Sequence, residues 1–259
     1  MLHDLNLDPD FFLKYLFHPP QAVLWGLWLT IWISVVAQTL GIAIGFCVAL
    51  ARMSAHKWLN VLAQVYVWAW RGTPLLVQLV LVYTGVAASG LYMYPDLVVG
   101  QFKLSGAVQA AIMTLALNEA AYMAEIFRAA ISAIDKGQFD ASRAIGMRSG
   151  QAMRWIILPQ AIRIVLPPLG NEFTLMIKST SLLAVIGIRE LFGTLQSLNA
   201  ATFKTFELFA IAAIWYLVLT SIMAVVQRIL EARFGRHEAV QVRPVPTPAR
   251  WRAFTVSRR

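Results

Sequence analysis

Five apolar regions of the sequence are each about as long as a helix that crosses a lipid bilayer. A transmembrane helix needs about 20 apolar residues to cross the hydrocarbon core. Lipid offers no partner to backbone polar groups, so only helices or closed barrels cross it, and the strict alternation of a barrel strand is missing. The sequence therefore predicts an all-α, polytopic membrane protein with about five transmembrane helices. The regions cover roughly residues 22–50, 73–93, 105–127, 164–188 and 206–227.

Lys and Arg residues are distributed unevenly among the segments that connect these regions. From the N-terminus to the C-terminus, the connections carry 1, 3, 1, 6, 2 and 8 of them. Because cytoplasmic loops are enriched in Lys and Arg, we expect the N-terminus outside and the C-terminus inside, in a multi-pass protein of the bacterial inner membrane. The same bias explains the net charge of +9 without nucleic acid, since no basic stripe with interleaved aromatic residues occurs.

Residues 57–71, "KWLNVLAQVYVWAWR", form an aromatic and amphipathic stretch before the second apolar region. Such a stretch is typical of a helix that lies in the membrane interface. Gly72 and Pro74 follow it, and both residues favour a change of chain direction. We therefore expect an interfacial helix that turns into the second span at this point.

The two ends of the sequence differ in composition from the apolar core, which we place at residues 22–230. The N-terminus is acidic and lacks the pattern of a cleavable signal peptide. Residues 236–259 mix Pro and Arg without apolar periodicity, which predicts a disordered, basic cytoplasmic tail. Residues 1–235 are thus expected to form one transmembrane domain.

Cys47 is the single cysteine, so neither an intramolecular disulfide nor a cysteine-based metal site is expected.

The cytoplasmic connection before the fourth apolar region is long and contains helix-prone sequence. Residues 138–145 lack Gly and Pro, and Gly146 then permits a tight turn or close approach by another backbone. A second short helix is expected from about 149 to 157, ending at Pro159. Composition alone leaves two interpretations open: the two helices lie back on the membrane, or they form a docking element for a partner.

The spacing of this connection resembles the signature loop of ABC importer permeases. That signature reads Glu-Ala-Ala, three residues, Gly, nine residues, Ile, one residue and Leu-Pro. Aspartate and serine replace the usual glutamate and second alanine, so any ion pair made by the shorter acid has to be re-spaced. The matching residues are Asp140, Ala141, Ser142, Gly146, Ile156, Leu158 and Pro159.

Other segments extend the resemblance over roughly residues 60–230. They are similar to the second, third and fourth spans of permease subunits of polar-amino-acid ABC importers, the family that carries histidine, glutamine, arginine or opines. In one departure, Ser179 follows Lys178 where the family usually has an acid. The segments are "RGTPLLVQL" at 71–79, "AAYMAEIFRAAI" at 120–131 and "LPPLGNEFTLMIKSTSLLAVIGIREL" at 166–191.

The resemblance implies that residues 135–160, the coupling loop, seat in a cleft of a separate ATPase subunit. Asp140 would pair with a basic group there, Ala141 and Ser142 would allow close approach, and Gly146 would set the angle to the second helix. Leu158 and Pro159 would fix the return into the membrane. The implied partners are two ATPase subunits, a second permease subunit (the same or a homologue), an extracytoplasmic binding protein and a polar amino acid.

Ionisable and polar residues within the third apolar region are candidates for the substrate path, because burial of such groups in a membrane is costly. Asn118 and Tyr122 share one helical face, with Glu119 beside it. Alternatively, Glu119 or Glu125 pairs with Arg128 or Lys178 inside the bundle. Glu125 and Arg128 are spaced as an ordinary helical ion pair.

In the fourth region Glu172 and Lys178 interrupt the apolar sequence, and they are candidates for an inner gate. Acidic residues at membrane depth favour a cationic or zwitterionic amino acid as the substrate.

Motifs of an enzyme are missing, and we expect no cofactor and no metal. Neither a phosphate-binding G-x-x-x-x-G-K-[ST] loop nor a zinc-binding H-E-x-x-H or a nucleophilic G-x-S-x-G sequence occurs. A membrane-bound enzyme or a sensor is therefore disfavoured. The alternative function is an ion-gradient-driven secondary carrier or channel, although many carriers are built from internal repeats, which this sequence lacks.

Overall fold

The computed structural model describes residues 8–99 and 102–234, and these residues are almost entirely helical. The first half contains α1 (Pro9–Phe17), α2 (Gln21–Arg52), α3 (Lys57–Gly72), α4 (Leu75–Val80), the π-helical turn η1 (Leu81–Gly85), α5 (Val86–Ala88), β1 (Leu97–Val99), β2 (Phe102–Leu104) and α6 (Gly106–Ser132). The second half contains α7 (Lys136–Ala144), α8 (Ser149–Ala152), the π-helical turn η2 (Met153–Ile157), α9 (Leu158–Ser179), the 3-10 helix η3 (Thr180–Ile186), α10 (Leu191–Thr202) and α11 (Thr205–Phe234). The predicted tail at 236–259 lies outside the described residues.

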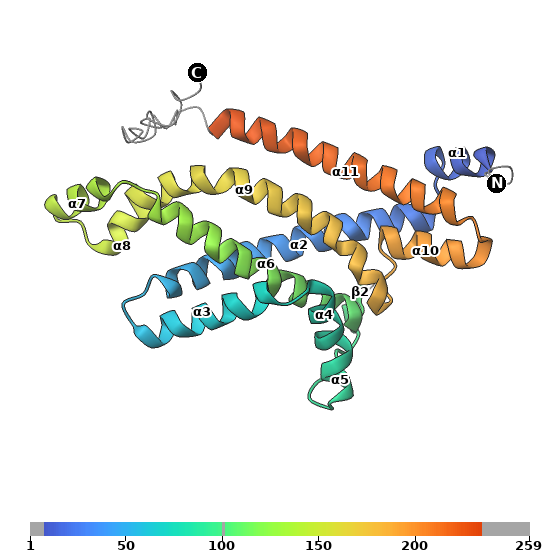
Figure 1. The fold of residues 1–259 in the computed structure, drawn as a ribbon, viewed down its shortest axis with the longest axis horizontal. Coiled ribbons are helices and arrows are strands. Elements are labelled where there is room, and N and C mark those ends of the chain that lie inside the picture. Colours follow the sequence, from blue (N-terminus) through green and yellow to red (C-terminus); the bar gives the residue numbers. More distant parts are fainter. Residues whose placement is uncertain (1–7, 100–101, 235–259) are drawn as a thin grey trace, which may run out of the picture.

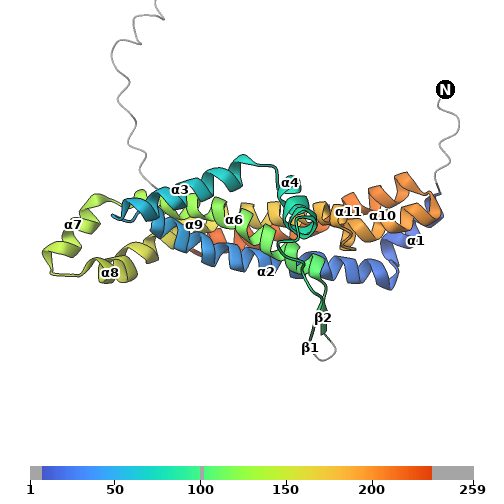
Figure 2. The ribbon, with the colours of Figure 1, turned by 90° about the horizontal axis from the view of Figure 1, so that it is seen from below.

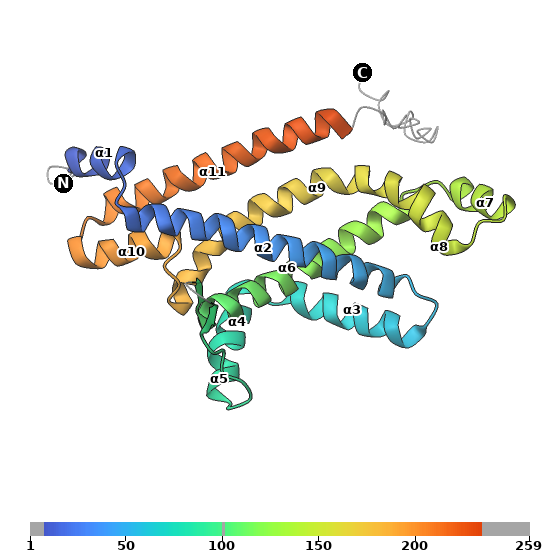
Figure 3. The ribbon, with the colours of Figure 1, turned by 180° about the vertical axis from the view of Figure 1, so that it is seen from behind.

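The long helices α2, α6, α9 and α11 run along the long axis of an elongated bundle (Figure 1). The turn between α2 and α3 lies at the same end as α7 and α8, whereas α1 and α10 lie at the opposite end (Figures 1 and 3). The basic connections predicted to be cytoplasmic therefore share one end of the bundle. This arrangement agrees with the all-α membrane fold expected from the sequence.

Within residues 8–99 and 102–234, only α2 and α11 are individually long and apolar enough to cross a membrane. The bent pair formed by α3 and residues 75–88 makes a third span if it counts as one. The helices expected as the third and fourth spans form as α6 and α9, but they are less apolar. A helix surrounded by protein can carry polar groups toward its neighbours. The number of five spans thus stays a prediction, as does the orientation.

Small residues allow α2 and α6 to pack closely along their length. Ala37, Gly41, Gly45 and Ala49 recur every fourth residue on α2 and are all buried. A Cβ atom on Gly45 would lie only 2.8 Å from the carbonyl oxygen of Ala120 on α6. In membranes such small-residue stripes let helix backbones approach each other, which increases van der Waals contact. This contact fixes the position of α6 at the centre of the molecule.

The prediction of an interfacial helix at 57–71 is wrong in its placement. α3 forms there, but it packs lengthwise beside α2 and α6 rather than across them (Figures 1 and 3). Buried Ala63 and Val67 account for this packing, since they give α3 a narrow face that fits the bundle. The chain then bends by 105° between Gly72 and Leu75, and the helix ends at Ala88. The candidate for the second span is therefore this bent pair rather than residues 73–93.

The expected end of the second loop helix at Pro159 is also wrong. Helical structure continues from α8 through η2 into α9, and Pro159 is the second residue of α9. Leu158 N–H bonds the carbonyl of Met153, five residues back. Proline removes one backbone donor and crowds the preceding turn. The wider π-helical turn just before Pro159 accommodates the missing donor and the crowding.

Two smaller elements lie outside the long helices. β1 and β2 form an antiparallel ribbon, with Leu97 opposite Leu104, that projects from the side of the molecule (Figure 2). α1 packs against α11 at the far end, where Lys204 Nζ lies 3.1 Å from Asp8 Oδ2. The backbone N–H of Phe11 and then Lys204 hold the pKa of Asp8 below its usual range. The ends of the fold are thus fixed by polar contacts.

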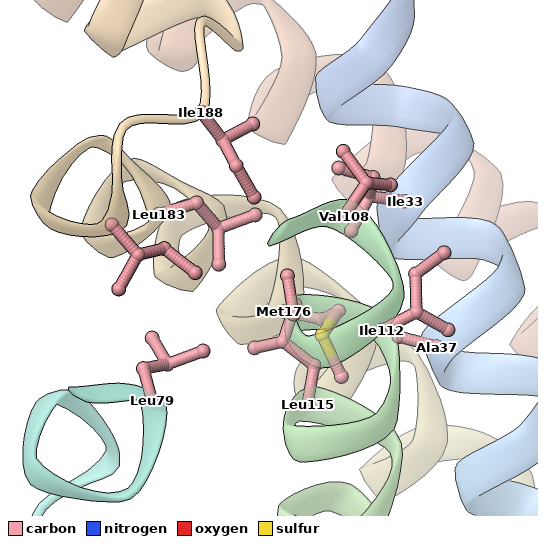
Figure 4. Close-up of a cluster of buried hydrophobic side chains, with 11 residues drawn as sticks. Ile33, Ala37, Leu79, Val108, Ile112, Leu115, Met176, Leu183 and Ile188 are labelled. Carbon is pink, nitrogen blue, oxygen red and sulfur yellow. The ribbon is translucent and has the colours of Figure 1, made fainter. Parts of the chain in front are cut away.

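A buried apolar cluster joins five elements in the middle of the bundle (Figure 4). It combines Ile33 of α2, Leu79 of α4, Leu115 of α6, Met176 of α9 and Leu183 of η3. All five side chains are at most 4% exposed. Leu115 and Met176 also form part of the wall of a cavity, so the cluster positions the candidate site.

Candidate functional site

A cavity of about 480 Å³ lies between the break after α3, the middle of α6 and the second half of α9. We call it the polar cavity, because its wall contains one arginine and two glutamates. The candidates Asn118, Glu119 and Tyr122 come together here, as their shared helical position predicts. The full lining is Arg71, Gly72, Thr73, Pro74, Leu75, Leu115, Asn118, Glu119, Tyr122, Glu172, Leu175, Met176 and Ser179.

Glu119 is 4% exposed and is held from the side of α2. Gln38 Nε2 donates a hydrogen bond of 2.8 Å to Glu119 Oε1. Among the ion pairs of the described chain none involves Glu119, so the alternative pairing with Arg128 or Lys178 is not formed. A carboxyl group is thus available at the cavity wall.

Asn118 also forms a hydrogen bond to the segment at the break between α3 and α4. Its Nδ2 donates to Gln78 Oε1 at 2.8 Å, and Gln78 Nε2 donates to the carbonyl of Trp70 at 2.8 Å and to Thr73 Oγ1 at 2.7 Å. These bonds satisfy backbone and side-chain groups that the end of α3 leaves without helical partners. Asn118 therefore ties the bent segment to α6 while it lines the polar cavity.

Arg71 and Glu172 complete the charged wall, and the sequence did not single them out as partners of the third span. The Arg71 guanidinium lies 5.1 Å from the centre of the Tyr122 ring, a cation–π distance. Glu172 reaches the same cavity from α9. Arg71 belongs to the segment "RGTPLLVQL". The family resemblance of this segment was the sequence feature that could have identified Arg71 as a site residue. The cavity thus combines both signs of charge with an aromatic ring.

Glu125 lies on α6 one turn beyond Tyr122, toward the end of the bundle with α7 and α8. It pairs with Arg128 at 3.0 Å, which confirms the predicted helical ion pair, and also with Arg52 of α2. A separate open cavity of about 480 Å³ is lined there by Arg52, Glu125 and residues of α3. Because two arginines pair with the Glu125 carboxylate, this group is already engaged in ion pairs within the fold.

Glu172 and Lys178, the candidates for an inner gate, are not brought together. Glu172 faces the polar cavity, whereas Lys178 lines a different cavity of about 310 Å³ beside Phe192, Phe209 and Tyr216. No ion pair joins them among the described residues. Six residues apart on one helix, the two side chains point in different directions.

The coupling loop begins with α7, which Asp135 caps by accepting a hydrogen bond from Gly137 N–H at 2.6 Å. Gly146 follows α7 with a φ of 80°, a left-handed conformation that strongly favours glycine. The expected turn at Gly146 is therefore confirmed. Asp140 is exposed on α7, and its Oδ1 lies 3.9 Å from Arg143, a loose surface pair.

Ser142 differs from its two neighbours in the signature, since it is 1% exposed. Its Oγ donates to the carbonyl of Phe139 at 2.7 Å, and its own carbonyl accepts from Met147 N–H at 3.0 Å. Asp140 and Ala141, in contrast, are exposed. Ser142 thus packs inside the loop, whereas Asp140 and Ala141 belong to the surface that is open to a partner.

The return into the bundle passes through Ile156, Leu158 and Pro159. Ile156 and Leu158 are half-buried, and Pro159 is exposed. Between them Ile157 is fully buried against the apolar cluster of α6 and α9. Two large apolar side chains remain outside, Ile145 at 74% and Trp155 at 66% exposed. The loop is therefore anchored on one side and presents apolar groups on the other.

Long helices in a bundle, a charged cavity among them and a helical loop at one end are features that a membrane permease requires. A family model described as "binding-protein-dependent transport system inner membrane component" matches residues 41–236. The chain belongs to this family, so it is the multi-pass membrane component of an ABC importer, a class of transporters that work with an ATPase and a binding protein.

Curated relatives and one solved structure agree with this assignment. The octopine transport system permease protein OccM of Rhizobium radiobacter is 39% identical, with 88% of this chain and 90% of the relative covered. The arginine transport system permease protein ArgU of Corynebacterium glutamicum is 41% identical over 80% of this chain, which spans 66% of that relative. A structure titled "Crystal structure of an amino acid ABC transporter with histidines" is 36% identical, with a TM-score of 0.76 over 88% of this chain and 99% of the other. The resemblance to permease subunits of amino-acid ABC importers is thereby confirmed.

Proposed function

We propose that this chain forms the pathway of an ATP-driven importer for a polar amino acid with a cationic or zwitterionic form. The polar cavity carries this proposal. It contains two glutamates and one arginine, so it can meet an ammonium group and a carboxylate at the same time. The names of the relatives that carry arginine and octopine support the same class of substrate.

The complex that we propose contains two permease subunits, two ATPase subunits and an extracytoplasmic binding protein in the bacterial inner membrane. The polar cavity lies beside the exposed break at Gly72, Thr73 and Pro74, so one chain alone does not enclose it. A second permease, identical or homologous, would complete the pathway. ATP is hydrolysed by the separate ATPase chain.

Within this complex the coupling loop transmits ATPase movement to the helices. Asp140 and Ala141 face the ATPase, and Ser142 and Gly146 fix the angle between α7 and α8. Ile156, Leu158 and Pro159 connect the loop to α9, so that a rigid-body movement of the loop reaches the polar cavity along α9. We assign Glu172 to the polar cavity rather than to a gate with Lys178.

Asn118, Glu119 and Tyr122 form the α6 wall of the substrate path in this proposal. An ion-gradient-driven carrier is the competing function, and the coupling loop separates the two. Only an ABC permease needs a surface that binds an ATPase at this end of the molecule.

The test is purification of the tagged chain from its native membranes in mild detergent, followed by mass spectrometry of the proteins that accompany it. We expect a stoichiometric ATPase, lost on Asp140→Lys because that change reverses the charge at the docking surface. Asp10→Lys makes the same change on exposed α1 at the opposite end and should retain the ATPase. Absence of an ATPase, together with uptake driven by an ion gradient, would establish the carrier instead.

A further inference from the structure

Gln38 lies within α2 and is 4% exposed, yet packing alone does not explain its presence. Its Nε2 bonds Glu119 at 2.8 Å and lies 4.0 Å from Met123 Sδ. Its Oε1 is buried, and no group of the described chain donates a hydrogen bond to it. An unpaired buried acceptor costs free energy. A residue kept at such a cost is expected where function requires it.

Gly41 lies one turn farther along α2, on the same face as Gln38. A Cβ atom at this position would lie 2.5 Å from Cγ and 2.7 Å from Cβ of Glu119. Only a glycine therefore leaves the space in which the Glu119 side chain folds against α2 and reaches Gln38. The two residues of α2 together determine where this carboxyl group lies.

Glu119 has one oxygen engaged and one oxygen available. Oε1 accepts the bond from Gln38, whereas Oε2 receives no hydrogen bond from the part of the chain that the structure describes. Glu119 also forms part of the wall of the polar cavity. A carboxyl group fixed at one oxygen presents the other as a pre-oriented acceptor, which lowers the entropic cost of binding a cation.

We propose that Gln38 is a positioning residue of the polar cavity, which holds Glu119 so that its free oxygen receives the ammonium group of the transported amino acid. This inference rests on the proposed function and deepens it, because it names the chemical group that Glu119 recognises. Gln38 acts through Glu119 and does not line the cavity itself.

The test uses the full chain with its co-purified ATPase and binding protein in proteoliposomes, with uptake of L-[³H]arginine and L-[³H]glutamine as probes. For the probe that is transported, Gln38→Met should raise KM about tenfold, the effect of losing one hydrogen bond to a charged group. We expect kcat to stay near the wild-type value. Thr39→Val is the matched control, because the exposed Thr39 hydroxyl bonds only the carbonyl of Val35 in its own helix.

A double-mutant cycle separates positioning from an independent effect. In the Glu119→Gln background, Gln38→Met should leave KM unchanged, because the group that it positions is already altered. A further tenfold increase in that background would mean that Gln38 acts on its own and would overturn the proposal.

A second pair of variants keeps Gln38 intact. Gly41→Ala should raise KM like Gln38→Met, since the added methyl group displaces Glu119. Gly45→Ala introduces a clash that is at least as severe one turn on, against Met123 Cβ at 2.6 Å and the Ala120 carbonyl oxygen at 2.8 Å, and should leave KM unchanged. Equal effects of the two alanine variants on KM would contradict the proposal, because they would trace the change to helix packing.

The failure of this inference and that of the proposed function give different results. If Glu119→Gln raises KM but Gln38→Met and Gly41→Ala do not, the cavity remains the transport site and the positioning role is wrong. If wild-type proteoliposomes transport neither probe, or if Glu119→Gln leaves KM unchanged, the assignment of the polar cavity to an amino acid fails first.

Discussion

Two buried glutamates have different roles: one presents a carboxyl oxygen to the polar cavity, and the other holds helices together. The Glu119 carboxyl group accepts one hydrogen bond and keeps a free oxygen at the cavity wall. Glu190 caps α10, is fully buried and joins three helices. Its carboxyl oxygens accept hydrogen bonds from Thr30 Oγ1 at 3.1 Å, Tyr216 OH at 2.8 Å, Phe192 N–H at 3.1 Å and Gly193 N–H at 2.7 Å. The two residues should therefore respond differently to replacement.

Replacing Glu190 by alanine should destabilise the protein without changing what it transports. The change leaves the Tyr216 hydroxyl and two backbone N–H groups without their acceptor, while Thr30 Oγ1 keeps the Gly26 carbonyl at 3.1 Å. One unsatisfied buried group already costs about 1–3 kcal/mol. We expect the free energy of unfolding in detergent to fall by about 3 kcal/mol, together with a lower thermal midpoint. Asp10→Ala on exposed α1 is the control. Equal midpoints for the two variants would show that the Glu190 bonds contribute no net stability.

Residues on one helix were easier to predict from the sequence than residues brought together by packing. Asn118, Glu119 and Tyr122 share a helical face, so their common location followed from spacing alone. Arg71 and Gln38 come from other helices, and their distance to Glu119 depends on the bend after α3 and on the small residues of α2. For Gln38 the signal was a polar residue within apolar sequence, where burial is costly, and for Arg71 it was the family resemblance of its segment.

At the scale of elements, proline and glycine had consequences that sequence rules describe only in part. A tight turn was one of the two roles predicted for Gly146, and its left-handed conformation, which few other residues adopt, agrees with that role. Pro159 was expected to end a helix, but the π-helical turn before it lets the helix continue. The lengthwise packing of α3 was missed as well, because an amphipathic stretch fits a membrane interface and a bundle surface equally well.

Gly146 offers a test of the joint between the two helices of the coupling loop. Nothing lies within 4 Å of a Cβ atom added there, so Gly146→Ala carries only the cost of a left-handed backbone, about 1–2 kcal/mol. We expect amino-acid-stimulated ATP hydrolysis to fall several-fold because the angle between α7 and α8 changes. Gly150→Ala also has free space but lies in helical α8, and it should leave this activity intact. If both variants behave like wild type, the joint does not determine coupling.

At the scale of the whole molecule, the arrangement of the helices says more about topology than hydropathy does. The central helix α6 buries 16 residues against its neighbours, so its sequence is free to carry Glu119 and Glu125. α11, in contrast, has a mostly exposed and strongly apolar surface suited to lipid or to a second subunit. Five spans, the number predicted from the sequence, would place the basic connections on one side of the membrane.

Cysteine labelling tests this count and the orientation together. In a Cys47→Ala background, we would place single cysteines at Ala55 in the turn before α3, at Ala144 at the end of α7 and at Ala201 in α10, all of which are exposed. A membrane-impermeant maleimide should label Ala201→Cys in right-side-out vesicles, because α10 lies at the end opposite to the coupling loop. It should label Ala55→Cys and Ala144→Cys only in inside-out vesicles, as the excess of Lys and Arg in their connections predicts. Labelling of Ala55→Cys and Ala144→Cys from opposite sides would mean that the bent pair and α6 do not both cross, since an even number of crossings must separate two positions on one side.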